Sequence, residues 1–161
     1  MEQTITIQGI RINYRKGGEG SPMILMHGWG CDSSTLSLFE RVGLEHHTVY
    51  NLDLPGFGKS QEPTSVWGVE EYASMLEEFV KQLGIDNPIL LGHSYGGRIA
   101  IVYASRNAVS KLILVDAAGV KPRHGLKYYL KVYSYKAAKR LYPLFVGREK
   151  ADKIIEQMRS Q

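Results

Sequence analysis

Polar and apolar residues alternate at the start of the chain. Residues 4–8 and 10–14 both repeat with a period of two, and Gly9 lies between them. This alternation is typical of strands that bury one face and expose the other to water. We therefore expect the chain to begin with two antiparallel strands joined at Gly9.

Four later segments are short and continuously apolar: residues 22–26, 49–52, 89–91 and 112–115. Such runs fit parallel strands that are covered on both faces. Between these runs lie apolar stripes with helical periodicity. The first stripe is formed by Leu36, Phe39 and Val42, the second by seven apolar residues between 69 and 83 before Gly84, and the third by residues 99–103. Alternating strands and helices predict an α/β fold with a mostly parallel sheet of six strands.

The strand pattern stops after Val120. Apolar residues between 126 and 141 predict an amphipathic helix, and those between 151 and 158 predict another, with Pro143 separating the two. No repeat or linker divides the chain. We therefore predict a sheet-containing core over residues 1–120 and a helical segment over residues 121–161.

Charge is unevenly divided between these two segments. Residues 1–120 hold 9 lysines and arginines against 13 acidic residues, whereas residues 121–161 hold 11 against 3. Because no nucleic-acid-reading motif accompanies the basic segment, we interpret it as solvated helix faces, or as a face that meets an acidic partner segment, and predict no nucleic-acid partner. The five histidines lack metal-ligand spacing and Cys31 is the single cysteine, so we expect neither a metal nor another cofactor.

The N-terminus and the hydropathy bear on location. No basic stretch followed by an apolar run opens the chain, and no window approaches the roughly 18 apolar residues of a membrane span. We therefore expect a cytoplasmic protein without a membrane partner.

The candidate chemistry centres on the Gly-x-Ser-x-Gly sequence formed by Gly92, Ser94 and Gly96, between a predicted buried strand and a helix. A sharp strand-to-helix turn lifts a serine hydroxyl clear of the sheet in a strained conformation, and crowding leaves room only for glycine two residues away on either side. The amide of Tyr95, at the start of the helix, can donate to a developing oxyanion. Alone, this short motif also fits a tightly packed turn without catalytic function.

Two further segments follow predicted strands and change that assessment. The sequence His27-Gly28-Trp29-Gly30 follows one strand, and Asp53-Leu-Pro-Gly-Phe-Gly-Lys-Ser60 follows the next. The first segment resembles the His-Gly-x-Gly oxyanion loop of the α/β-hydrolase fold family, and the second resembles the Asp-x-Pro-Gly-x-Gly-x-Ser loop of the same family. The serine motif resembles the nucleophile position of that family. The resemblance implies that residues 1–120 form a partial core of this fold and that the helical remainder begins the family's cap.

The resemblance also assigns roles to individual residues. It implies that Ser94 is the nucleophile and that the amides of Trp29 and Tyr95 hold the oxyanion, with Gly28, Gly30 and His27 shaping the loop. It implies acyl transfer on carboxylic esters, or on the C–C bonds of diketone-like acids, because the dehalogenase and epoxide-hydrolase branches carry aspartate where this chain has serine. The substrate is a small molecule.

The rest of the catalytic triad is the open question. In the family, the acid and the histidine follow two later strands, and this sequence ends before them, so we expect an incomplete chain with little activity of its own. Asp116 and His124 follow Ser94 in the required order and are substitute candidates, although a turn residue and an exposed histidine would give the same pattern.

Two alternatives to a self-sufficient enzyme stay open. One is a non-catalytic protein that binds a small molecule in the same pocket. The other is a half-molecule that needs a partner chain. Residues 112–115 would then form an apolar edge strand, which predicts a homodimer or association through the sheet edge.

Overall fold

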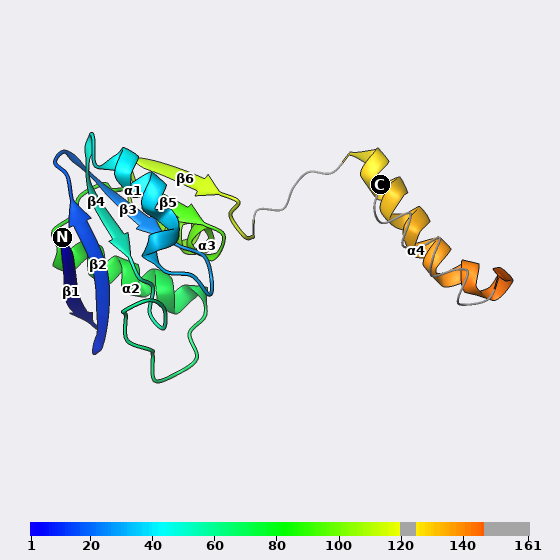
Figure 1. Cartoon of the computed structure of the whole chain (residues 1–161), viewed down its shortest axis with the longest axis horizontal. Coiled ribbons are helices and arrows are strands. Elements are labelled where there is room, and N and C mark those ends of the chain that lie inside the picture. The colour runs from blue at the N-terminus through cyan, green and yellow to red at the C-terminus, as the bar shows by residue number, and fades with distance from the viewer. Residues whose placement is uncertain (120–124, 147–161) are drawn as a thin grey trace. The chain divides into compact units, whose positions relative to one another are not determined.

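The computed structural model describes residues 1–119 and 125–146 (Figure 1). The chain divides into two compact units, Met1–Val120 and Lys121–Gln161. The first unit holds the sheet and every residue of the serine, His27 and Asp53 motifs.

A six-stranded sheet forms the first unit, as the sequence pattern predicts. The strands are β1 (Glu2–Ile7), β2 (Ile10–Gly17), β3 (Ser21–Met26), β4 (His47–Leu52), β5 (Ile89–His93) and β6 (Lys111–Val115). Their order in the sheet is β1-β2-β4-β3-β5-β6. The β1–β2 and β2–β4 pairs are antiparallel, and the remaining pairs are parallel. The mostly parallel α/β fold is therefore confirmed.

Helices cover both faces of this sheet because alternate residues of the central strands point to opposite sides. Ile24, Leu52 and Leu90 point toward the larger core, which includes residues of α2 (Val69–Gln82) and α3 (Tyr95–Ala104). Leu25 and Leu91 point to the other face, toward the short helix η1 (Ser33–Leu36) and α1 (Ser37–Gly43). The central strands are therefore buried on both faces.

The connections of β3 and β5 run to opposite faces of the sheet. β3 leads to η1 and α1, whereas β5 leads directly into α3. Open α/β sheets bind ligands beyond the carboxyl ends of the strands at such a switch point. This arrangement brings residues 27–30, which follow β3, next to the serine that follows β5.

One residue of the predicted core stripes is exposed instead. Val42 of α1 has 57% of its surface accessible, although Leu36, in the same predicted stripe, is buried. Val42 and Leu38 line an apolar groove of about 490 Å³ that reaches Ile113 of β6.

The second unit contains α4 (Leu126–Val146). The predicted helix end before Pro143 is wrong, because α4 continues past this residue. The fixed backbone angle of proline is compatible with a helix, but proline removes one N–H donor and its ring crowds the carbonyl four residues earlier, so a helix contains it at a cost. The predicted helix over residues 151–158 lies outside the described residues. Among the described helices, none combines the length and hydropathy needed to cross a bilayer.

Strand β6 closes one end of the sheet. On its outer side it pairs with no other strand among the described residues. Leu112 and Leu114 are more than a third exposed, at 36% and 38%. An apolar strand with one unpaired edge is a template for pairing with another chain.

We therefore expect two copies of the chain to associate through β6. Substituting Leu114→Lys places a charge at that edge, and sedimentation velocity at rising concentration should show a dimer for the unmodified chain and a monomer for this variant. The control is Val66→Lys, at a loop position that is 99% exposed, which should leave the dimer intact. A monomeric unmodified chain would contradict the prediction.

Candidate functional site

Ser94 lies in a strained turn between β5 and α3. Its φ is 50° and its ψ is −108°, a conformation that non-glycine residues rarely adopt. Two main-chain hydrogen bonds hold it, because its N–H donates to Val115 (3.1 Å) and its carbonyl oxygen accepts from the amide of Ala118 (2.9 Å). The end of β6 therefore stabilises the turn that carries the hydroxyl.

The two glycines of the serine motif have no space for a side chain. A Cβ on Gly92 would lie 2.5 Å from the carbonyl oxygen of Gly96, and a Cβ on Gly96 would lie 2.2 Å from the carbonyl oxygen of Met26. The amide of Gly96 also donates to the carbonyl oxygen of His27 (3.1 Å). The spacing of the motif is therefore a packing requirement, and it holds the turn against the end of β3.

Residues 27–30, the His27 loop, lie directly against Ser94. A Cβ on Gly28 would be 3.2 Å from the Cβ of Ser94. Gly30 has open space around it but a φ of +75°, so this glycine serves the backbone conformation and not a close approach. Within residues 1–119 and 125–146, the amides of Trp29 and Tyr95 donate to no other group.

His27 is completely buried and holds this loop in place. Its Nε2 accepts from the amide of Leu54 (2.9 Å), so its Nδ1 carries the proton and donates to the carbonyl oxygen of Gly28 (2.7 Å). Burial lowers the pKa of His27 below its ordinary value, despite the opposing hydrogen bond to Gly28. Because both ring nitrogens are engaged, His27 is not available as a general base.

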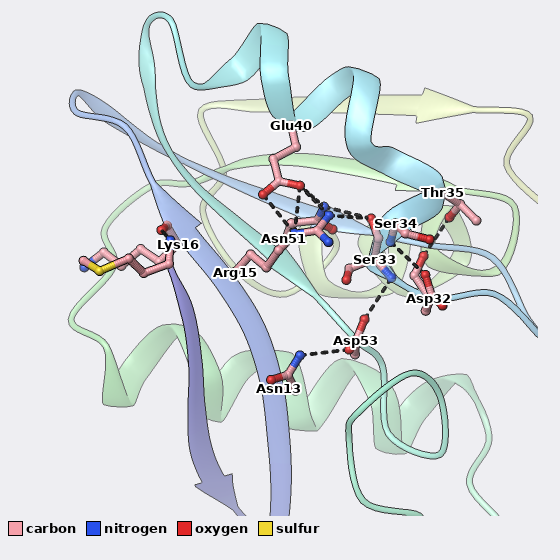
Figure 2. Close-up of polar contacts among 11 residues, drawn as sticks. Asn13, Arg15, Lys16, Asp32, Ser33, Ser34, Thr35, Glu40, Asn51 and Asp53 are labelled. Carbon is pink, nitrogen blue, oxygen red and sulfur yellow. Dashed lines mark hydrogen bonds and ion pairs between the residues drawn. The ribbon is translucent and has the colours of Figure 1, made fainter.

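Asp53 fastens three segments of the first unit together (Figure 2). Its buried carboxylate accepts from the amide of Ser33 (2.8 Å), the side-chain amide of Asn13 (2.9 Å) and the amide of Lys59 (3.0 Å). Burial by itself would raise the pKa of Asp53, but these donors more than compensate and hold its pKa below the usual value. This Asp53 network joins β2, the segment after the His27 loop and the segment after β4.

Comparison of the sequence with models of protein families identifies one family. Residues 21–150 match the sequence model of the alpha/beta hydrolase fold. The chain belongs to this family.

Three similar proteins show how broad this α/β-hydrolase family is. The chain is 32% identical to a soluble epoxide hydrolase from Corynebacterium, over 68% of this chain and 39% of that protein. It is 33% identical to a 2-hydroxy-6-oxo-2,4-heptadienoate hydrolase from Pseudomonas putida, over 70% and 43%. The crystal structure of a membrane phospholipase A superposes with a TM-score of 0.73 at 32% identity, over 83% and 45%. The chain therefore spans less than half the length of these relatives.

The substitute triad is not assembled among the described residues of this α/β-hydrolase. Asp116 is exposed, has a φ of 44° and forms no hydrogen bond or ion pair within the described part of the chain. His124 lies outside the described residues, so the pairing of Asp116 with His124 stays a prediction. The hydroxyl of Ser94 contacts no base in residues 1–119 or 125–146.

His93, the residue before Ser94, is partly buried. Its buried Nδ1 has no hydrogen-bond partner among the described residues.

Cys31 is partly buried and forms no disulfide. In the described part of the chain, no cluster of three or more histidine, cysteine or acidic residues is placed to hold a metal ion.

Sequence reasoning missed a second polar cluster beside the Asp53 network. Arg15 donates from Nε to Glu40 (3.0 Å), and the side-chain amide of Asn51 donates to the same carboxylate (2.9 Å) and to the carbonyl oxygen of Ser33 (3.0 Å). Figure 2 shows this cluster between β2, β4 and α1. The only signal in the sequence is the polar Asn51 inside an apolar strand.

The lowered pKa of His27 predicts a pH-dependent stability. The unfolded chain takes up a proton near the ordinary value of 6.5, whereas the folded chain does so only at lower pH. Folding stability therefore decreases as the pH falls below about 6.5, by at most about 1.4 kcal/mol per pH unit for this one proton. Thermal unfolding between pH 7.5 and pH 5 measures this slope.

His27→Gln should reduce that slope and lower stability at pH 7.5 by about 1–3 kcal/mol, because the hydrogen bonds to Leu54 and Gly28 are disturbed. His46→Gln is the matched control, since His46 is exposed and the substitution also removes one histidine. An unchanged slope in His27→Gln would show that another group is responsible.

Proposed function

We propose that this chain carries the nucleophile of a serine hydrolase that acts by acyl transfer on carboxylic esters or related carbonyl compounds. One observation carries the proposal: Ser94 sits in a strained turn beside two main-chain amides, of Trp29 and Tyr95, that have no partner among the described residues. Amides without a partner in the protein are free to donate to a ligand beside Ser94. An oxyanion would use both.

The reaction follows from this arrangement. The Ser94 oxygen attacks the carbonyl carbon, and the carbonyl oxygen becomes an oxyanion that accepts from the two amides. Helix α3 begins at Tyr95, and the dipole of the helix favours negative charge at this end. The serine proton passes to a general base outside the described residues, either His124, a residue beyond this sequence or a residue of a partner chain.

The nucleophile type favours carbonyl chemistry over epoxide opening. A serine hydroxyl forms acyl-enzyme intermediates with carbonyl carbons, whereas the branches of the family that open epoxides or remove halides carry aspartate at this position. The similarity to the Pseudomonas putida dienoate hydrolase makes C–C hydrolysis of a diketone-like acid a second substrate class for the same nucleophile.

A second candidate function is reversible binding of a small molecule without turnover. It is favoured by the absence of any base in contact with Ser94 within the described residues. In that case the same two amides would bind a carbonyl or an anion of the ligand and no covalent bond would form. Covalent labelling separates the two functions.

We expect a fluorophosphonate probe to modify Ser94 and no other serine, and to do so slowly, because the two amides still stabilise the developing charge although no base contacts Ser94 among the described residues. Intact-mass and peptide analysis should show the adduct, and Ser94→Ala should abolish it. The control is Ser110→Ala, which removes an exposed serine outside any such turn and should leave labelling unchanged. If Ser94 stays unmodified while a carbonyl ligand binds reversibly, the binding function is correct.

Ester turnover by the chain alone should be negligible. A serine hydrolase that loses its histidine base loses about 10⁶-fold in rate, and hydrolysis of p-nitrophenyl acetate measures the remaining activity. Turnover that Ser94→Ala abolishes would show that the chain already contains its base.

A further inference from the structure

A second cavity adjoins the His27 loop. It has a volume of about 520 Å³ and lies between Trp29 and the irregular segment that leads from β4 to α2. Four aromatic rings line it, those of Trp29, Phe57, Trp67 and Tyr72, whereas Ser94 does not. We call it the aromatic pocket. Both tryptophans of the chain line this one cavity.

The rings of the aromatic pocket are braced against one another. Trp29 meets Phe57 edge to face with centroids 5.0 Å apart, and Trp67 meets Tyr72 in the same way at 5.3 Å. Burial raises the pKa of Tyr72 to about 12, so its hydroxyl keeps its proton and donates to the carbonyl oxygen of Pro55 (2.9 Å). The walls are therefore largely formed before a ligand enters, which reduces the entropy cost of binding.

Tyr95 connects this pocket to the candidate catalytic turn. Its ring contacts Trp29 with centroids 5.3 Å apart and Tyr72 at 5.5 Å. Trp29 is 62% exposed even with these contacts, so much of its indole is available to a ligand. A group in the aromatic pocket would therefore touch the side chain of Trp29, whose amide is one of the proposed oxyanion donors. Trp29 in turn contacts Tyr95, whose amide is the other.

The charge around the aromatic pocket restricts its ligand. Glu62 is the only charged residue in the lining, and it forms no ion pair or hydrogen bond within the described residues. The faces of aromatic rings also carry negative electrostatic potential. An anionic group would be repelled, whereas a neutral or cationic flat ring would stack on or against the tryptophans.

We propose that the aromatic pocket binds a planar aromatic group without negative charge, as the part of the substrate attached near the reacting carbonyl. The placement beside the carbonyl rests on the proposed function, because it uses Trp29 and Tyr95 as oxyanion donors. The binding itself does not depend on Ser94, so it can be tested separately.

The test is a titration of tryptophan fluorescence with three ligands that share a ring: benzyltrimethylammonium, benzyl alcohol and phenylacetate. We expect a saturable change for the cation and the neutral ligand, with dissociation constants of about 1 mM for molecules of this size, and binding of phenylacetate at least about tenfold weaker. Trp29→Phe and Trp67→Phe each leave one reporter, and each remaining tryptophan should respond. Ser94→Ala should bind as the unmodified chain does.

Charge reversal provides the decisive comparison. Glu62→Lys should raise the affinity for phenylacetate and lower that for benzyltrimethylammonium. Glu45→Lys is the matched control, because it makes the same charge change at an exposed position before the opposite end of β4. The proposal is overturned if no ligand gives a saturable signal, if phenylacetate binds as tightly as the cation, or if both charge reversals act alike. If the fluorophosphonate probe does not label Ser94 of the unmodified chain but the ligands bind the aromatic pocket, only the catalytic proposal is refuted.

Discussion

The close approach of the Ser94 turn to the end of β3 is the constraint on which the site depends. Gly96 packs so tightly on the carbonyl oxygen of Met26 that any side chain would clash. This contact places the start of α3 beside the His27 loop, so that the hydroxyl lies in one region with two amides that donate to no group in residues 1–119 or 125–146. The strain at Ser94 persists because Val115, at the end of β6, and Ala118, in the segment after it, hold both of its main-chain polar groups.

Buried polar groups make the surrounding loops rigid. His27 accepts from the amide of Leu54, and Asp53 accepts from the amides of Ser33, at the start of η1, and of Lys59. A loop held by charged or polar buried side chains has few alternative conformations, because leaving such groups unpaired is costly. Catalysis by preorganised donors requires this rigidity, since the donors must not reorient when charge develops. The aromatic contacts of Trp29 with Phe57 and Tyr95 restrain the same loop from its exposed side.

The sequence alone predicts the sheet well and the polar contacts poorly. Alternating and continuously apolar patterns indicate directly which faces of a strand are buried, so all six strands were predictable. The glycine spacing around Ser94 indicates crowding in the same way. Contacts between distant residues leave no periodic trace. The Arg15–Glu40 pair and the partners of Asp53 therefore became visible only in three dimensions. Pro143 shows the opposite case. It is a strong local signal for the end of a helix, yet α4 continues past it.

The central claim is that a carbonyl oxygen of a substrate bound at Ser94 accepts from the amides of Trp29 and Tyr95. A crystal structure of the chain with a phosphonate covalently attached to Ser94 tests it most directly, since the phosphoryl oxygen takes the place of the oxyanion. The account predicts that this oxygen lies within about 2.7–3.1 Å of both amide nitrogens. An adduct whose phosphoryl oxygen faces solvent, or a Ser94 side chain turned toward the core, would contradict it.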